Sequence, residues 1–146
     1  MWYSRVLVFF QFFALFILML PLYTIEIEYA WVFSFISASL ALKLFIWTLY
    51  HNKLGNFNIV PEIKEGCSLV STGPYQYIRH PMYTSVVLLG LAALFFSFAL
   101  FKLGVMLGLI MILFLKAKKE EALWCEGQEG YELYAKKTKM FLPFIL

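Results

Sequence analysis

Residues 84–115 read TSVVLLGLAALFFSFALFKLGVMLGLIMILFL, an almost uninterrupted apolar run of 32 residues. A single straight helix of this length would reach about 48 Å, well beyond a hydrocarbon core of about 30 Å. Two complete spans would need about 40 residues, more than the run contains. Ser97, Lys102 and Gly104 lie near its middle and suit a turn. We therefore predict a tight hairpin of two short helices, over about residues 84–98 and 101–115.

The composition of the whole chain is that of an integral membrane protein. Of its 146 residues, 62% are hydrophobic and 14% are charged. A soluble domain averages about 45–50% apolar and about 25% charged residues. The length suits one domain over residues 1–146. Apolar runs at about 6–22 and 30–50 add two helices, so we predict an all-α fold with about four transmembrane helices.

The distribution of Lys and Arg predicts the orientation in the membrane. Residues 23–29, between the first two spans, carry no Lys or Arg, whereas six lysines lie between Lys116 and Lys139. The positive-inside tendency then places both termini, the 51–83 connection and the 116–146 tail in the cytoplasm. Cys67 and Cys125 would be reduced thiols on that side, and their spacing indicates neither a disulfide framework nor a metal site.

A polar cluster stands at each end of the apolar run. Residues 73–83 read GPYQYIRHPMY, and residues 116–121 read KAKKEE. A hairpin returns the chain to the side where it started, whereas a single span would separate the clusters. The hairpin therefore predicts that Arg79 and Glu120 lie on the same side, in a site at the membrane surface.

Simpler interpretations of these residues remain open at this stage. Arg79 and His80 are compatible with an interfacial cation pair that faces lipid phosphates. The paired glutamates also suit a solvated helix face beside lysines. Pro81 is expected to begin the third helix, because proline suits a first turn. The GxxxG match at 104–108 is expected to let helices pack closely.

Several segments together resemble the isoprenylcysteine carboxyl methyltransferase family, which is related to integral-membrane phospholipid methyltransferases. The resemblance covers about the C-terminal two thirds, and the first span is generic. It rests on Leu54-Gly55, on LVSTGPY at 69–75, on RHPMY at 79–83, on Glu120-Glu121, on YELY at 131–134 and on FLPF at 141–144.

The resemblance implies transmembrane helices with a C-terminal cytosolic helical cap, enclosing S-adenosylmethionine at the membrane face. An arginine of the family that meets the methyl acceptor is replaced here by Lys116, and Ser85 stands where a glycine is common. The spacing of residues 126–130 also differs from the family pattern. The implied cofactor-binding residues are Leu69, Val70, Tyr75, His80, Pro81, Met82, Tyr83 and Glu120.

The chemistry of S-adenosylmethionine suits these residue types. Arg79 is able to pair with its carboxylate, and Glu120 with its ammonium group or ribose. The face of Tyr75 or Tyr83 is able to stabilise the sulfonium by cation–π contact. We take Lys116, Arg79 and Glu121 as the catalytic candidates.

The nature of the methyl acceptor decides whether a base is needed. An acceptor that is already a carboxylate needs none, and positioning then provides most of the rate. An amine acceptor must lose a proton, which would make His80 or Glu121 the receiving group.

We predict S-adenosylmethionine-dependent methyl transfer to the carboxylate or thiol of an isoprenylcysteine-like or other small membrane lipid. The alternatives are a phospholipid amine N-methyltransferase, an NADPH-dependent sterol-type membrane reductase, and a non-enzymatic four-helix scaffold or lipid-binding protein. The GPY and RHP forms argue against the reductase. Two separated histidines predict no metal site, and a net charge of +3 gives no reason to expect nucleic acid.

Overall fold

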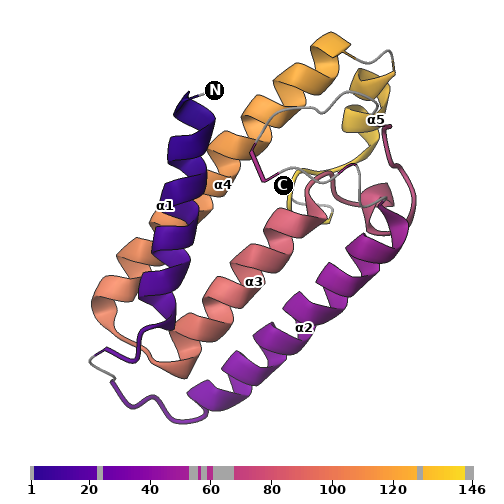
Figure 1. The fold of residues 1–146 in the computed structure, drawn as a ribbon. Coiled ribbons are helices and arrows are strands. Elements are labelled where there is room, and N and C mark those ends of the chain that lie inside the picture. The colour runs from indigo at the N-terminus through magenta and orange to yellow at the C-terminus, as the bar shows by residue number, and fades with distance from the viewer. Residues whose placement is uncertain are drawn as a thin grey trace.

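The computed structural model describes residues 2–22, 25–52, 56, 59–60, 68–127 and 130–143. Within these ranges the chain is helical and contains no strand, which confirms the all-α prediction (Figure 1). A single isolated bridge joins Ile78 to Lys139. The elements are α1 (Trp2–Met19), α2 (Ala30–His51), the 3₁₀ turn η2 (Gly73–Gln76), α3 (Pro81–Phe96), α4 (Leu100–Gly127) and α5 (Tyr131–Lys137).

Three helices of the described chain, α1, α2 and α4, are long and apolar enough to cross a membrane. Helix α3 is apolar as well, but its 16 residues fall just below the range of about 17–25 that a span needs. The structure thus supports an integral membrane protein with three candidate spans. That α3 is a fourth span stays a prediction.

The predicted hairpin is present, with two corrections to its limits. Helix α3 ends at Phe96 and α4 begins at Leu100, so Ser97 lies in the turn, whereas Lys102 and Gly104 already belong to α4. Helix α4 also does not end near residue 115 but continues to Gly127. The physical reason is that KAKKEEALW contains strong helix formers and no proline or glycine.

Lys102 links the C-terminal end of α1 to the α3–α4 hairpin through hydrogen bonds. Its buried ammonium group donates to the carbonyls of Leu18 at 3.0 Å and Leu20 at 2.6 Å, and to the hydroxyl of Ser97. The carbonyls at a helix C-terminus have no partner within the helix, so the lysine satisfies the end of α1.

Close packing between helices occurs at Gly90 of α3. A Cβ atom there would lie 3.0 Å from Sδ of Met106 and 3.1 Å from Cδ2 of Leu109. The expectation for the GxxxG match was wrong, because a Cβ atom on Gly104 or Gly108 would have nothing within 4 Å among the described residues. The central buried cluster comprises Ala14, Leu18, Leu94, Met106, Leu109 and Leu113.

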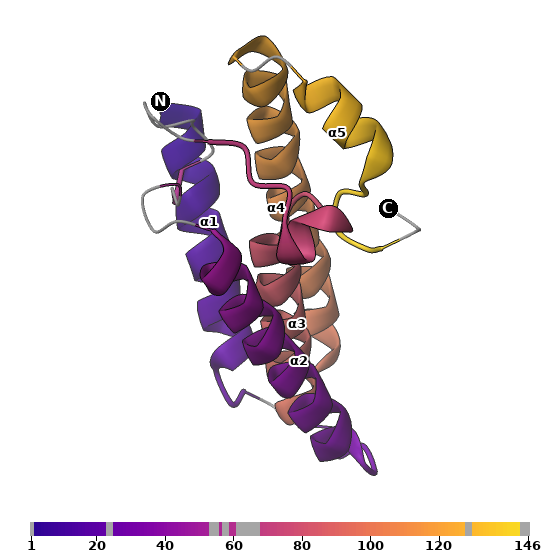
Figure 2. The ribbon, with the colours of Figure 1, turned by 90° about the vertical axis from the view of Figure 1, so that its right-hand side faces the viewer.

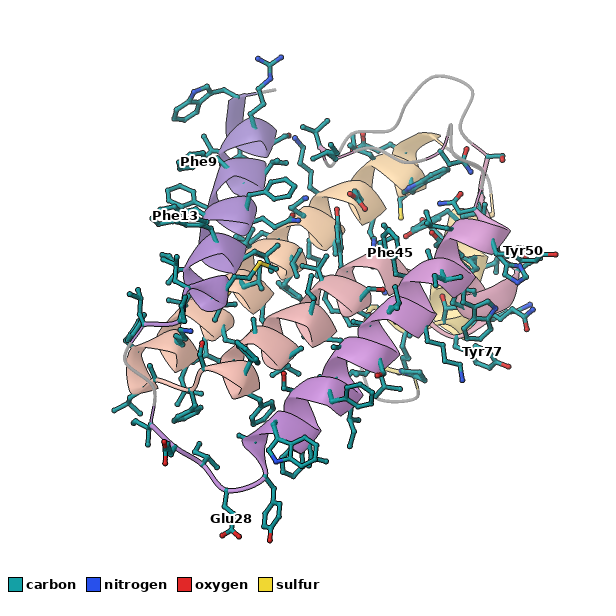
Figure 3. The ribbon with its side chains drawn as sticks, turned by 60° about the horizontal axis from the view of Figure 1, so that its bottom comes forward. Phe9, Phe13, Glu28, Phe45, Tyr50 and Tyr77 are labelled. Atoms are coloured by element: carbon teal, nitrogen blue, oxygen red, sulfur yellow. The ribbon has the colours of Figure 1, made fainter. Side chains whose placement is uncertain are left out.

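Large aliphatic and aromatic side chains are exposed on the outer surface of the bundle, which suits contact with lipid. Figure 3 shows Phe9 and Phe13 pointing away from the bundle on α1, and Tyr50 doing so on α2. Phe45 also lies on α2. All four are exposed within the chain.

The elements divide between two ends of the bundle. Helix α1 packs against α4, and α2 packs against α3. One end holds the connection that follows α1 and the α3–α4 turn, joined by a hydrogen bond from the Ile25 amide to the Phe98 carbonyl at 2.7 Å. The start of α1, the end of α2, η2 and α5 gather at the opposite end (Figures 1 and 2). That this end faces the cytoplasm stays a prediction.

Candidate functional site at the α5 end of the bundle

The 3₁₀ turn η2 is clamped between α2 and α5. Gly73 has φ 60°, and a Cβ atom there would lie 2.4 Å from the ring of His51 at the end of α2. The Asn52 amide donates to the Tyr75 hydroxyl at 2.9 Å, and the Tyr134 hydroxyl of α5 donates to the Tyr75 carbonyl at 2.7 Å. Only glycine combines this φ with so close an approach, so the local geometry requires the glycine of GPY.

The RHP segment is held by the chain that follows α5. The Arg79 amide donates to the Lys139 carbonyl at 2.8 Å, and the His80 amide donates to the Met140 carbonyl at 3.1 Å. In return the Lys139 amide donates to the Tyr77 carbonyl at 3.0 Å. This short parallel pairing fixes the backbone just before α3, where Pro81 opens the helix as expected.

His80 lies between the two predicted glutamates of α4. Its Nδ1 is 3.4 Å from Oε2 of Glu120, and its Nε2 is 3.2 Å from Oε1 of Glu121. The Tyr83 hydroxyl donates to the other oxygen of Glu120. The rings of His80 and Tyr83 stack with centroids 5.5 Å apart. The hairpin therefore brings the RHPxY and EE clusters to the same side, as predicted, and the structure shows them in direct contact.

Arg79 extends from this cluster toward α5. Its Nε donates to Oε1 of Glu121 at 2.6 Å, and its Nη1 donates to the carbonyls of Ala135 at 2.9 Å and Thr138 at 2.5 Å. The guanidinium thus holds α5 against α4 and fixes the Glu121 carboxylate.

The carboxylates also set the charge of His80. Burial alone would lower the pKa of the imidazole, but the hydrogen bonds and negative charges of Glu120 and Glu121 together raise it above the ordinary value. His80 is therefore stabilised as an imidazolium between two anions.

The pKa of the Tyr75 hydroxyl is also raised. Burial is the main reason, and the Glu120 charge adds to it.

Lys116 lies beside the cluster on α4 and is fully buried. Its ammonium group donates to Oε1 of Gln11 at 2.6 Å and to the carbonyl of Ile59 at 3.0 Å. It also stands over the ring of Tyr83, 5.1 Å from the centroid. This places the predicted acceptor-binding cation next to the Tyr83–Glu120 pair.

The other predicted cofactor residues lie on the same connection but outside this network. Met82 is half-buried in the first turn of α3, and Leu69 and Val70 are half-buried before η2. No hydrogen bond or ion pair among the described residues joins these three side chains to the carboxylates. Their place beside a cofactor stays a prediction.

Sequence reasoning missed the contribution of α1. Gln11 holds Lys116, and the hydroxyl of Ser4 accepts from Lys119. Both α1 residues are buried, although the first span looked generic. A lone amide inside an apolar run was the available signal, because polar side chains in spans generally face a partner.

Two further contacts come from the end of the chain and were not predicted. Thr84 donates to the Phe141 carbonyl at 2.9 Å, and the Phe141 ring lies 6.0 Å from that of His80.

Of the cysteines, Cys125 is free and exposed. Cys67 lies outside the described residues.

The fold and this cluster define a membrane protein with a polar site at one end of its helices. Residues 31–125 match the family model for the isoprenylcysteine carboxyl methyltransferase (ICMT) family. The match covers more than half of the chain, so the chain belongs to this family. No curated protein matches the sequence.

Membership has a general functional meaning, because the family carries out methyl transfer to lipid-like acceptors in membranes. It confirms the predicted membrane methyltransferase class and disfavours the reductase and scaffold alternatives. The matched residues include RHPMY and Glu120-Glu121 but not α1. The Gln11–Lys116 contact therefore joins the family region to a helix outside it.

Proposed function

We propose that this protein binds S-adenosylmethionine and methylates the carboxylate or thiol of an isoprenylcysteine-like or other small membrane lipid. The observation that carries the proposal is the convergence of His80, Tyr83 and the paired glutamates at one end of the α3–α4 hairpin. These residues belong to the part of the chain that matches the family.

The chemistry of the cluster fits this cofactor. A carboxylate offers about four lone-pair positions, so Glu120 retains acceptor capacity beside Tyr83 and His80 for an ammonium group or ribose hydroxyls. The stacked Tyr83 and His80 rings place aromatic surface next to that carboxylate. Aromatic faces attract cations such as a sulfonium. We assign Leu69, Val70, Tyr75, Pro81 and Met82 to the remaining cofactor contacts.

S-adenosylmethionine supplies an electrophilic methyl group when it is bound. Lys116 is placed to hold an anionic acceptor, because its ammonium group lies over the Tyr83 ring and is already desolvated. Gln11 fixes the position of that ammonium group. Arg79 and Glu121 support the site by holding the helices and His80 in place.

The alternative of an amine acceptor finds less support in this geometry. An amine has to lose a proton, whereas His80 is favoured in its protonated form and is a poor base. Glu121 already accepts from Arg79 and faces His80. A carboxylate acceptor needs no such base, whereas a thiol must first ionise, so the geometry favours the carboxylate.

The cofactor assignment is tested by binding of tritiated S-adenosylmethionine to the detergent-solubilised protein. We expect saturable binding to wild type and a loss of at least about tenfold in affinity for Glu120→Ala and His80→Ala, since charged hydrogen bonds contribute about 1.5–3 kcal/mol. Lys43→Ala, at an exposed position on α2, should bind like wild type. Binding of NADPH in place of S-adenosylmethionine would refute the assignment.

The acceptor class is tested by methyl transfer to total membrane lipids followed by alkali treatment. A methyl ester releases volatile labelled methanol, whereas methyl thioethers and methylated amines retain the label. We expect Lys116→Ala to reduce transfer while cofactor affinity stays within about twofold, because its contacts lie on the acceptor side. An equal loss of cofactor affinity would contradict that role.

A further inference from the structure

A cationic pocket lies on the side of α4 that faces α5. Its volume is about 370 Å³. Arg79, Lys118, Lys136 and Lys139 contribute positive charge to its lining, and Phe114 and Met140 contribute apolar surface. Of these residues only Arg79 takes part in the methyl-transfer proposal, where it holds Glu121 and α5, and the lysines have no role in it.

The three lysines of the pocket have no anionic partner within the described chain. The glutamate carboxylates that form ion pairs there contact Arg79 and His80. Lys118 instead lies over the Phe114 ring, 5.7 Å from its centroid. Three ammonium groups around one cavity repel one another, so the pocket is complementary to an anion.

The pocket is separate from the acceptor side of the site. Successive residues of a helix are rotated by about 100°, so Lys118 and Lys116 point about 160° apart around α4. Lys116 accordingly contacts α1 through Gln11, whereas Lys118 lines the pocket beside α5. One anion cannot occupy both places.

An apolar stripe continues from the pocket along α4. Phe114 lies one turn below Lys118, and the same face continues through Met111, Ile110 and Leu107. These three are exposed, at 59%, 40% and 68%. Lys118 to Leu107 spans about 16 Å at about 1.5 Å per residue. A headgroup pocket that continues into an apolar stripe matches an amphiphile better than a free phosphate.

We propose that this pocket binds the phosphate headgroup of an anionic membrane phospholipid. The phosphodiester lies among Lys118, Lys136 and Lys139, and the acyl chains lie over the exposed stripe of α4. The lipid bridges α4 to the segment after α5, which also holds the RHP backbone through Lys139 and Met140. Occupancy therefore stabilises the end of the bundle that carries the site.

Native mass spectrometry of the detergent-solubilised protein tests the proposal. The protein is mixed with equal amounts of phosphatidylglycerol and phosphatidylcholine, and the retained lipid is identified by mass. We expect one phosphatidylglycerol to be retained in preference. Each of Lys118→Gln, Lys136→Gln and Lys139→Gln should weaken retention about fivefold, from the usual attraction of one lysine to an anionic lipid.

Lys137→Gln is the matched control. It removes the same charge from the adjacent position of α5, but Lys137 does not line the pocket. We expect it to retain phosphatidylglycerol like wild type, and Lys136→Arg to do so as well. Equal weakening by Lys136→Gln and Lys137→Gln would show diffuse attraction to a charged surface and would overturn the proposal.

Two further arms separate this proposal from its competitors. Glycerol phosphate carries the headgroup without acyl chains. If glycerol phosphate displaced phosphatidylglycerol when the two are present at equal concentration, the phospholipid assignment would be overturned in favour of a free phosphate.

The second arm measures S-adenosylmethionine binding to the same variants. Loss of cofactor affinity in Lys118→Gln would place the pocket within the cofactor site and overturn the separate role. Lipid retention is independent of whether the protein methylates anything.

Discussion

At the scale of single residues, Gly73 shows how one position controls the approach to the site. Its φ of 60° is open to glycine at little cost, and the His51 ring fills the space that a Cβ atom would need. Gly73 is therefore constrained twice, by its positive φ and by its close contact with the His51 ring of α2. The sequence marked it only as part of GPY.

We expect Gly73→Ala to destabilise the protein by about 1–3 kcal/mol from backbone strain, with the clash against His51 added. Tryptophan fluorescence during thermal unfolding in detergent measures this. Gly130→Ala is the matched control, because Gly130 also has positive φ, at 91°, but open space around it. Adding His51→Ala should recover part of the Gly73→Ala loss, and no recovery would show that the contact is unimportant.

His80 makes the stability of the fold depend on pH. Two carboxylates raise its pKa above the ordinary value of about 6.5, so the folded state favours the imidazolium. The resulting stabilisation is complete below about pH 6.5 and is lost as the pH rises through the higher folded-state pKa.

We expect the midpoint of thermal unfolding to fall for wild type between about pH 6 and pH 9, and to fall less for His80→Asn. In Glu120→Gln one of the two charges is gone, so the decline should begin at lower pH. The same measurement in matched buffers decides the point. Identical pH profiles for wild type and His80→Asn would contradict the assignment of this effect to His80.

At the scale of elements, two faces of α4 have different surroundings. One face packs against α3, where the Met106 and Leu109 side chains lie close to Gly90, and the other carries Gly104 and Gly108 with no neighbour in the described chain. A GxxxG pattern alone did not reveal which glycine makes the contact, because that depends on how the helix is rotated.

The same substitution at two glycines tests this assignment. Gly90→Leu should destabilise by about 1–3 kcal/mol, because it overpacks the contact with Met106 and Leu109. Gly104→Leu should be neutral or stabilising by up to about 1 kcal/mol, since leucine favours helix and points outward. Unfolding in detergent compares the two. Strong destabilisation by Gly104→Leu would show that its face packs against something.

At the scale of the whole molecule, the start of α1 and helix α5 lie at the same end as the site (Figure 1). The four-helix prediction, with its even number of crossings, expects this arrangement, and the fourth span stays a prediction. From the charge bias of the chain we expect that end to face the cytoplasm.

Cys125, exposed near the end of α4, reports the orientation. The chain has two cysteines, so Cys67→Ser leaves a single thiol. A membrane-impermeant maleimide should label this variant in inside-out vesicles and leave it unlabelled in intact cells. Cells opened with detergent serve as the control for reactivity. Labelling in intact cells would reverse the proposed topology.

The sequence alone determined the hairpin and the meeting of its two polar clusters. The reason is a length constraint, because 32 apolar residues are too long for one crossing and must return the chain to its starting side. That return puts His80 and the paired glutamates on one side of the bundle, and the structure shows that they are in contact. The limits of α4 were less predictable, since lysines and glutamates look like a tail but favour helix.

The tertiary structure alone decided which side chains face one another across the helices. Gln11 against Lys116, Lys102 at the end of α1 and the lysines around the α4–α5 pocket all depend on helix rotation and on the reach of long side chains. Residues far apart in the chain carry no spacing that encodes these contacts. They arise when packing fixes the rotation of each helix, because buried polar groups must then find the nearest partner.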